Sequence, residues 1–295
     1  MREFVRSGAG RQSSPTTPSA RSSSHSHRRQ SDHRTPGDDG SGYPRGVAQT
    51  TLAIDIGGTG IKGAVLAPKG EMVSPRVKVK TTYPMPPAAL VEVLTKFSER
   101  FPESKQIAIG FPGVVRRGKI LSAPHFQTER GLGTDISPTL VKQWSGFNLA
   151  ESVAKATGTT VRVVNDAEMQ GLGVITGRGV EVVITLGTGF GFSVFEEGVA
   201  APHMELGSMP LLKGKTLDEE LGNRGRKSRG DAEWSSRVHT TVGLIDTLVN
   251  FDHCYIGGGN ARTIGRDGFG PILKKITIVG NIAGILGGRH LFPTT

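Results

Sequence analysis

The sequence predicts an α/β fold built from two similar lobes, and two observations carry that prediction. Short runs rich in Val, Ile and Leu alternate with segments of helical periodicity along most of the chain. A strand–glycine turn–strand unit also occurs twice, around residues 57–60 and again around residues 187–191. Two copies of one unit, far apart in the sequence, indicate two lobes that face one another.

The expected elements follow from these patterns. Short β-branched and aromatic runs predict strands at 51–56, 61–66, 76–81, 106–109, 161–164, 181–186, 191–195, 254–256 and 276–279. Apolar residues at helical spacing predict helices at 87–100, 149–157, 167–175 and 231–250, and a final helix from 282. Residues 125–146 are polar and are expected to form a long irregular loop.

These elements predict a division of the chain into three parts. Residues 1–48 form a tail, residues 49–165 the first lobe and residues 166–295 the second lobe. The two lobes are expected to meet near 165–180. The final helix is expected to return to the first lobe.

Composition excludes several other classes of protein. The chain has 295 residues, of which 36% are hydrophobic, which is enough to bury a core. Its one cysteine, Cys254, permits no internal disulfide and no cysteine-based zinc cluster, and we expect its thiol to be buried. No apolar run is long enough to span a membrane, and the start lacks a signal-peptide core. The expected location is therefore the cytoplasm.

The segment 1–48 differs from the rest of the chain. It is rich in Ser, Arg and Pro and has almost no apolar side chains, so we predict that it is disordered. The segment could be a nucleic-acid-binding arm, an organellar transit segment or an extension without a specific role, and we expect the last. Nucleic-acid binding is not favoured because the only aromatic residues of the segment are Phe4 and Tyr43.

The two glycine turns are candidate phosphate sites. Phosphate oxygens bind clustered backbone N–H groups, which glycine leaves uncovered, and threonine adds a hydroxyl donor. Asp55 could hold Mg²⁺ through water, and Lys62 could add a positive charge. The residues concerned are Asp55, Gly57, Gly58, Thr59 and Lys62 in the first turn and Thr188 and Gly189 in the second. Two ordinary β-turns are the alternative, which the repeated Gly-Thr pair makes less favoured.

A third glycine turn follows the strand at 254–256. Gly257, Gly258 and Gly259 would permit the close approach of a nucleotide's sugar or base. A plain strand-to-helix turn is an equally good interpretation of a triple glycine.

Asp166 is the candidate catalytic base. It follows a buried strand, and ligands bind at the carboxyl ends of strands in open α/β sheets. There it could take the proton of a hydroxyl group that attacks a phosphoryl group. The alternative is an N-cap of the next helix. Its neighbour Asn165 can donate hydrogen bonds to a polyol and accept them.

Glu205 has two possible interpretations. A glutamate after a strand is ordinarily a solvated surface residue. It gains a function only if it faces Asp166 across a cleft.

These motifs, in this order, resemble the ROK family of sugar kinases, within the superfamily of actin-like ATPases and sugar kinases with a ribonuclease H-like fold. The resemblance covers residues 51–292 and is closest to the polyphosphate/ATP-dependent glucokinase branch. Its motifs are DIGGTGIK (55–62), FPGVV (111–115), VVNDAEMQGLG (163–173), ITLGTGFG (184–191), HMELGS (203–208), YIGGGNA (255–261) and VGNIAGILGG (279–288).

The resemblance implies a function for each motif. Asp166 matches the catalytic base; Asn165, Glu205, His125 and Gly113 fall on the sugar side. The first two glycine turns match phosphate sites, Asp55 a magnesium-side carboxylate, and the third glycine turn an adenosine site. The implied reaction moves a terminal phosphoryl group from polyphosphate or ATP to a hexose, with glucose O6 as the expected acceptor. Mg²⁺ and a homodimer are implied, and membrane association is not.

Three departures from the family pattern leave the sugar open. Ser208 stands where the family commonly has histidine, and His125 stands where an asparagine that contacts sugar is often found. The loop at 125–145 is long, and the cysteine-rich zinc motif is absent, so no zinc is expected. Mannose or fructose as acceptor, and a catalytically weak sugar sensor, remain alternatives. A repressor is not favoured, because residues 1–48 show no paired amphipathic helices.

The net charge of +10 favours an anionic partner. Six basic residues lie close together after the Glu205 motif: Lys213, Lys215, Arg224, Arg226, Lys227 and Arg229. They could form an ordinary solvated face or guide a long polyphosphate, so the choice between ATP and polyphosphate stays open.

Overall fold

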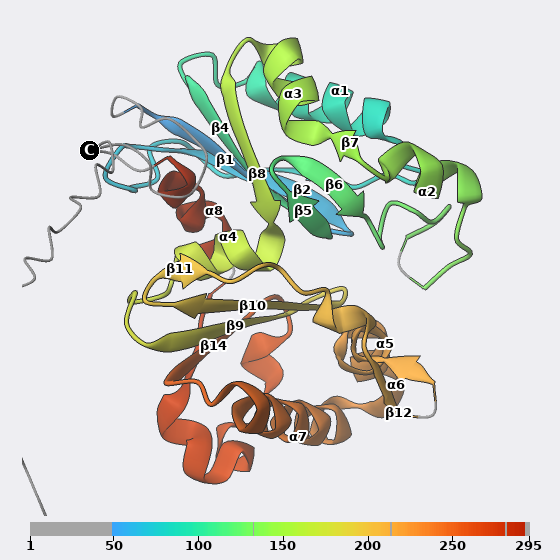
Figure 1. The fold of residues 1–295 in the computed structure, drawn as a ribbon, viewed down its shortest axis with the longest axis vertical. Helices are drawn as coiled ribbons and strands as arrows, with labels where there is room; N and C mark the ends of the chain where they lie inside the picture. The colour runs from blue at the N-terminus through green and yellow to red at the C-terminus, as the bar shows by residue number, and fades with distance from the viewer. Residues whose placement is uncertain (1–48, 132, 213, 281, 293–295) are drawn as a thin grey trace, which may run out of the picture. The chain divides into compact units, whose positions relative to one another are not determined.

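The structure is a computed structural model that describes residues 49–131, 133–212, 214–280 and 282–292. The predicted disordered tail, residues 1–48, lies outside the described residues. The described residues form one compact unit that contains two five-stranded sheets with their helices (Figure 1). Within the described ranges, no helix is both long and apolar enough to cross a membrane.

The two large sheets have the same topology. In each, the first strand is central, the next two continue antiparallel on one side, and the last two lie parallel on the other. The first sheet has the order β3 (Val77–Lys80), β2 (Gly60–Leu66), β1 (Thr51–Ile56), β4 (Gln106–Phe111) and β8 (Thr160–Asn165). The second has the order β11 (Val199–Ala200), β10 (Phe190–Glu196), β9 (Val180–Leu186), β14 (His253–Gly257) and β15 (Ile276–Ile278). This repetition confirms the predicted two-lobed α/β fold.

The first lobe adds three helices and a small sheet to its main sheet. The helices are α1 (Pro87–Ser98), α2 (Pro138–Trp144) and α3 (Leu149–Thr157), and the small sheet contains β5 (Val114–Arg116), β6 (Lys119–Ser122) and β7 (Phe147–Asn148). The expectation of an irregular loop throughout residues 125–146 is therefore wrong at α2. Pro138 lies in the first turn of this helix, where its missing N–H costs nothing. Leu140 and Trp144 are buried, and the Trp144 indole N–H donates to the Met85 carbonyl.

In the second lobe, the long helix α7 lies on the side of the sheet that faces away from the first sheet (Figure 1). The elements are the hairpin β12 (Pro210–Leu212) and β13 (Lys215–Thr216) and the helices α5 (Leu217–Leu221), α6 (Asn223–Arg229) and α7 (Asp231–Val249). Short 3₁₀ segments are η1 (Leu206–Ser208), η2 (Ala261–Thr263), η3 (Arg266–Lys275) and η4 (Gly288–Leu291). Cys254 is fully buried in this lobe, as predicted, and burial raises the pKa of its thiol.

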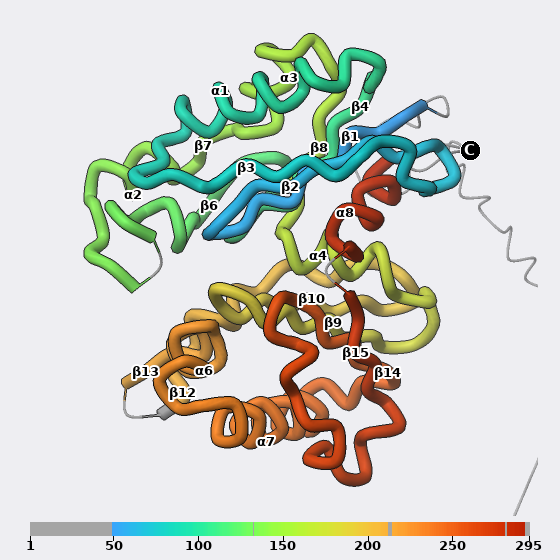
Figure 2. Tube along the Cα trace, turned by 180° about the vertical axis from the view of Figure 1, so that it is seen from behind, coloured from blue at the N-terminus to red at the C-terminus, as the bar shows by residue number. Residues whose placement is uncertain are grey.

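Two helices connect the lobes. Helix α4 (Asp166–Leu172) follows β8 and contacts both sheets, since Gly110 packs against Met169 and Gly171 packs against Phe195. Helix α8 (Ala283–Gly287) lies against β1 and β2, where Ile285 belongs to a buried cluster with residues of those strands (Figure 2). The last helix thus packs on the first sheet, and α4 and α8 pack closely together.

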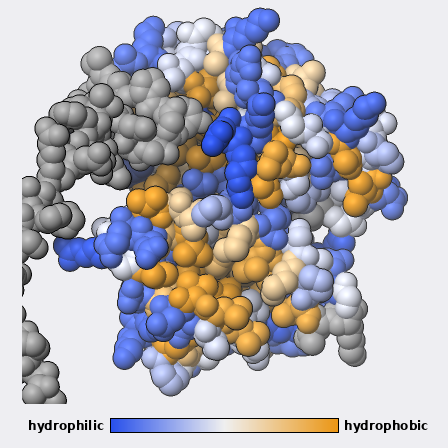
Figure 3. All heavy atoms as spheres, viewed as in Figure 1, coloured by the Kyte–Doolittle hydropathy of each residue, from blue (hydrophilic) through white to orange (hydrophobic). Residues whose placement is uncertain are grey.

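Apolar side chains are exposed on one edge of the second lobe. Hydrophobic residues gather over this lobe in the space-filling view (Figure 3). Val199 in the edge strand β11 is 71% exposed, and Met204 is 51% exposed. Neither residue lines the cleft described below.

Candidate active site

A cleft of about 390 Å³ opens between the two sheets. Its walls come from the glycine turns, from the end of β8 and from loops of both lobes. The residues selected from the sequence that line it are Asp55, Gly57, Gly58, Thr59, Lys62, Gly113, His125, Asn165, Asp166, Thr188, Gly189, Glu205, Gly258 and Gly259. Of the residues named in the three glycine turns, Gly257 alone does not line the cleft.

The first glycine turn leaves backbone N–H groups free. The Thr81 hydroxyl donates to the Gly57 carbonyl at 2.7 Å, and the Tyr83 hydroxyl donates to the Gly58 carbonyl at 2.8 Å. Among the described residues, no group accepts a hydrogen bond from the N–H of Gly58 or Thr59. With carbonyls held and N–H groups free, the turn presents donors to the cleft, as an anion site requires.

The second glycine turn is held in the same way. The Asn223 backbone N–H donates to the Gly187 carbonyl at 2.9 Å, and the Asn260 side chain donates to the same oxygen at 3.1 Å. Within the part of the chain that is described, the N–H groups of Thr188 and Gly189 have no acceptor. Both turns therefore combine fixed carbonyls with free donors.

The two turns approach each other across the cleft. A Cβ atom added to Gly58 would lie 3.4 Å from the Thr188 methyl carbon and 2.6 Å from His125 Nδ1. Any side chain at Gly58 would narrow the space between the turns, so glycine is required by close approach. One anion could thus contact donors from both lobes.

Asp166 lies at the start of α4, but Asn165 caps that helix. The Asn165 side-chain oxygen accepts from the N–H groups of Ala167 at 2.8 Å and Glu168 at 3.3 Å. The capping interaction that was the alternative for Asp166 therefore falls to its neighbour. The Asp166 carboxylate keeps one hydrogen bond, from the Ala167 N–H at 3.0 Å, and faces the cleft.

The pKa of the Asp166 carboxyl is raised well above its usual range. Burial is the largest cause, followed by the charges of Asp55 and Glu205. The Asp166 carboxyl therefore holds its proton more tightly than an ordinary aspartate does. A raised pKa makes the ionised form a stronger base, as a general base near neutral pH requires.

Asn165 is occupied within the protein. It is 3% exposed, and its side-chain nitrogen donates to the carbonyls of Gly113 at 3.1 Å and Phe111 at 3.4 Å. These bonds hold the turn after β4 against the start of α4. Its predicted contact with sugar hydroxyls stays a prediction, since the carboxamide already has partners at both ends.

Three charged side chains lie opposite one another across neighbouring strands of the first sheet. Asp55 in β1 lies opposite Lys62 in β2, and Lys62 lies opposite Lys78 in β3. Lys62 Nζ is 3.5 Å from the Asp55 carboxylate. Burial raises the pKa of Asp55, while Lys62 and Arg76 oppose that shift. Two lysines directly opposite are unfavourable unless an anion lies near them, and both line the cleft.

The cleft suits Mg²⁺ bound together with phosphates. Among the described residues, no group of three or more His, Cys, Asp and Glu could hold a metal by itself. Mg²⁺ commonly uses one or two carboxylates plus substrate phosphates and water. Asp55, a half-buried carboxylate beside the first phosphate turn, provides such a ligand.

His125 and Glu205 both line the cleft. Burial lowers the pKa of His125 to about 4, against the opposing charge of Glu205, so the imidazole is neutral near pH 7. His125 Nδ1 is buried and has no hydrogen-bond partner among the described residues. The Glu205 carboxylate is 3.4 Å from Nε2 of the buried His203. Ser208 is exposed and lines a neighbouring cavity.

The third glycine turn contributes two of its three glycines. Gly258 has φ +90°, a conformation that favours glycine, and an added Cβ would clash with the Leu186 carbonyl. Gly259 also lines the cleft. Gly257 ends β14, and the position of its missing Cβ is occupied by the Gln170 amide nitrogen.

Several lining residues escaped the sequence analysis: Lys78, Gln170, Asp218, Asn223 and Asn260. Asp218 accepts a hydrogen bond from the Phe190 N–H at 2.6 Å, and burial raises its pKa to about 6. Its only sequence signal is the capping box TLDE of α5, which marks a helix start and no site. Lys78 alternates with apolar residues in β3, which indicates a strand but no site. Its position opposite Lys62 follows from the register of β2 and β3, which the sequence alone does not show.

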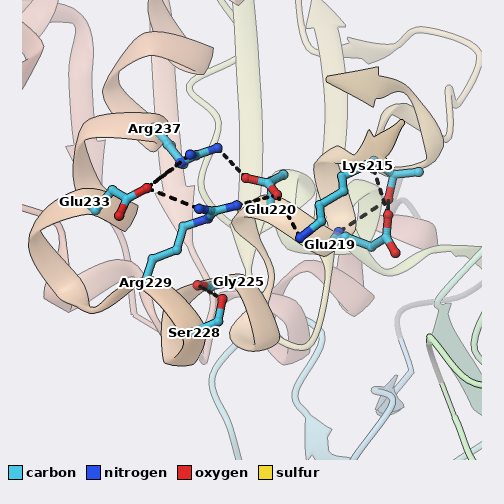
Figure 4. A network of polar contacts seen from close by, with 9 residues as sticks. Lys215, Glu219, Glu220, Gly225, Ser228, Arg229, Glu233 and Arg237 are labelled. Atoms are coloured by element: carbon cyan, nitrogen blue, oxygen red, sulfur yellow. Dashed lines mark hydrogen bonds and ion pairs between the residues drawn. The ribbon is translucent and has the colours of Figure 1, made fainter. Parts of the chain in front are cut away.

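Three residues of the basic run, Lys215, Arg226 and Arg229, form ion pairs inside the second lobe, and Figure 4 shows those of Lys215 and Arg229. Arg229 and Lys215 lie 2.6 Å and 3.8 Å from the Glu220 carboxylate, and Arg226 lies 2.8 Å from Asp231. These side chains stabilise α5, α6 and α7 against one another. Their charges are therefore partly neutralised before any ligand binds.

A second cavity of about 470 Å³ adjoins the cleft. Arg224 and Lys227 line it, and Arg224 also donates to the Gly133 carbonyl of the first lobe at 3.2 Å. Lys213 lies outside the described residues. The two cavities share Pro124, Thr188, Asp218 and Asn223.

The paired sheets, the connecting helices and the cleft between them define a protein of the actin-like ATPase and sugar kinase class. Residues 51–202 match the ROK family. The chain belongs to the ROK family, which confirms the resemblance seen in the sequence.

Individual relatives are similar over most of the chain. A polyphosphate glucokinase of Mycobacterium tuberculosis is 28% identical over 252 residues, which cover 80% of this chain and 88% of the relative. The crystal structure of an inorganic polyphosphate/ATP-glucomannokinase from Arthrobacter sp. strain KM is 27% identical, with a TM-score of 0.68, and covers 83% of this chain and 98% of its own. A ROK family glucokinase from Streptomyces griseus, in complex with glucose and AMPPNP, shares the fold at 18% identity and a TM-score of 0.65, covering 82% and 98%.

Proposed function

We propose that this protein is a hexokinase-type phosphotransferase that moves the terminal phosphoryl group of polyphosphate or ATP to a hexose, forming glucose 6-phosphate from glucose. One observation carries the proposal: two turns with free backbone N–H groups and the half-buried carboxylate of Asp166 line the same cleft. The relatives named polyphosphate glucokinase and polyphosphate/ATP-glucomannokinase support this choice of donor and acceptor.

The proposed reaction is a direct transfer in the cleft. The sugar hydroxyl gives its proton to the Asp166 carboxylate while its oxygen bonds to the terminal phosphorus. The bond from that phosphorus to the bridging oxygen breaks, and the electron pair leaves with ADP or with the shortened polyphosphate. The N–H groups of Gly58, Thr59, Thr188 and Gly189 stabilise the charge on the transferring group.

Other residues bind and orient the reactants. Glu205, Gly113 and His125 are assigned to the sugar, and Gly258 and Gly259 to the adenosine end of ATP. Lys62 and Lys78 add positive charge beside the first turn. Asp55 is assigned to Mg²⁺, which would neutralise phosphate charge when bound.

The first experiment is a product assay. The protein is incubated with glucose, mannose or fructose and with ATP or polyphosphate in the presence of Mg²⁺, and sugar phosphate is measured. Sugar phosphate formation is the expected result. Saturable sugar binding without product would favour the catalytically weak sensor instead.

Replacing Glu205 with glutamine is expected to raise the dissociation constant for the sugar about tenfold or more, because a charged acceptor for a hydroxyl is lost. Titration calorimetry with glucose measures this. The exposed Glu99→Gln serves as control, since Glu99 is far from the lining residues in sequence and does not line the cleft. Unchanged affinity in Glu205→Gln would remove Glu205 from the sugar site.

Polyphosphate is proposed to continue from the cleft into the second cavity. The two cavities share Thr188 of the second phosphate turn, so a chain longer than a triphosphate has a path past that turn. Lys227 lines this path. Attraction between Lys227 and the chain would weaken as salt concentration rises.

Replacing Lys227 with alanine is expected to raise KM for polyphosphate several-fold and to leave KM for ATP nearly unchanged. Steady-state kinetics at low ionic strength measure both constants. Lys155→Ala on the exposed surface of α3 is the matched control. An equal rise in KM for both donors, or an unchanged KM for polyphosphate, would show that polyphosphate does not pass Lys227.

Four sequence predictions stay proposals: Mg²⁺ dependence, the homodimer, the cytoplasmic location and the identity of the preferred hexose. Dependence on Mg²⁺ and the choice of hexose are read from the product assay, and the oligomeric state from light scattering.

A further inference from the structure

Buried polar atoms without hydrogen-bond partners are rare in folded proteins. Among the described residues, such side-chain atoms occur in Ser104, His125, Gln170, His203 and Arg229. Of these residues, only His125 and Gln170 line the cleft. His125 is already assigned to the sugar side, which leaves Gln170 without an explanation.

Gln170 lies one helical turn after Asp166 on α4, so both side chains project from the same face of the helix. It is 8% exposed. Its amide nitrogen occupies the position of the missing Cβ of Gly257, directly before Gly258 and Gly259 in the cleft wall. The carboxamide is therefore held near the third glycine turn on the floor of the cleft.

The chemistry of this atom points to an anionic partner. An amide N–H is a donor and carries no charge. Carboxylates at Asp55 and Asp166 already occupy the cleft, and a neutral donor serves a phosphate oxygen without neutralising the base.

We propose that Gln170 is a donor-binding residue whose amide nitrogen donates a hydrogen bond to a phosphate oxygen of the phosphoryl donor. This inference rests on the proposed function, because it assigns the donor to the same cleft. Gly257 has a corresponding structural reason: only glycine leaves room for the carboxamide beside the end of β14.

The test compares Gln170→Met, which keeps length and volume but removes the donor, with Gln106→Met. Gln106 is also 8% exposed, but it lies in β4, accepts from the Thr51 hydroxyl and does not line the cleft. The measurements are KM and kcat for ATP and polyphosphate, KM for sugar, the dissociation constant of inorganic tripolyphosphate with Mg²⁺, and thermal melting.

Gln170→Met is expected to weaken tripolyphosphate binding about tenfold or more, since a hydrogen bond to a charged group is lost. The KM for sugar should stay within twofold, and the melting temperature should not fall, because the wild-type amide has no partner to lose. Gln106→Met should lower the melting temperature and leave the kinetic constants unchanged.

Donor constants within twofold of wild type would overturn the assignment, as would a lower melting temperature with unchanged kinetics. Failure of the proposed function looks different. If wild type forms no sugar phosphate yet binds tripolyphosphate in a manner that depends on Gln170, the assignment stands and sugar phosphorylation fails. If wild type neither reacts nor binds tripolyphosphate, both are overturned.

Discussion

Replacing Asp166 with asparagine is expected to lower kcat for sugar phosphorylation by about 10²–10⁴-fold, the usual contribution of a general base. Asparagine has nearly the same shape but cannot take the hydroxyl proton. Sugar affinity should change little, because the Asn165 cap and the fold of α4 stay intact. Steady-state kinetics and calorimetry separate these effects.

The same replacement should raise the melting temperature at neutral pH. The folded protein holds the Asp166 proton more tightly than the unfolded chain, because burial and the charges of Asp55 and Glu205 raise its pKa. The contribution of Asp166 to the free energy of unfolding is therefore greatest below its unfolded pKa and declines as pH rises through the raised pKa of the folded state. A neutral asparagine removes this penalty, and a gain in stability with a loss of activity is typical of a catalytic group.

The wild-type pH profile provides a check on this assignment. Activity requires ionised Asp166, so it should fall as pH decreases through the raised pKa, at a higher pH than an ordinary aspartate gives. Asp218 has a pKa of about 6, so its ionisation could produce a similar fall in activity at low pH. If Asp166 is the base, the fall should persist in Asp218→Asn. An activity that survives in Asp166→Asn would assign the base to another group.

Replacing Glu220 with glutamine is expected to lower the free energy of unfolding by about 3 kcal/mol, the low end of the cost of breaking a buried ion pair. Glu220 is 1% exposed and pairs with Arg229, Arg237 and Lys215 (Figure 4). Without its charge, two guanidinium groups lose their shared buried partner. The low end applies because both arginines are partly exposed, at 21% and 25%. Chemical denaturation measures the change.

Glu233→Gln is the matched control. Glu233 pairs with the same two arginines, but it is 53% exposed, so water screens the loss and little change is expected. Equal destabilisation by both variants would show that burial at Glu220 is unimportant. The network also affects function, since α5 and α6 carry Asp218 and Asn223, which hold the second glycine turn.

The sequence predicted the sheet strands and the glycine turns well because their signals are local. Strand β1 at 51–56 follows from a short, mostly apolar run that ends at a glycine turn, and β9 follows from the same pattern. Helix α2 was missed because its seven residues are few for a periodicity argument. Its signal was Pro138 at the start with Leu140 and Trp144 one turn apart.

The site was predicted only where residue type carries the chemistry. Asp166 and the glycine turns have characteristic neighbours, whereas Gln170 and Lys78 gain meaning only from contacts made by folding. The basic run shows the same limit. Which arginines pair with Glu220 depends on how α5, α6 and α7 pack, and the sequence alone does not determine this.

The central claim is that both glycine turns bind one phosphoryl group within reach of Asp166. A crystal structure with glucose and a non-hydrolysable ATP analogue tests it most directly. We predict that the terminal phosphate lies between the N–H groups of residues 58–59 and those of residues 188–189, with the Asp166 carboxylate hydrogen-bonded to the acceptor hydroxyl of the sugar. A terminal phosphate that contacts one turn alone, or a sugar hydroxyl beyond hydrogen-bond reach of Asp166, would contradict the account.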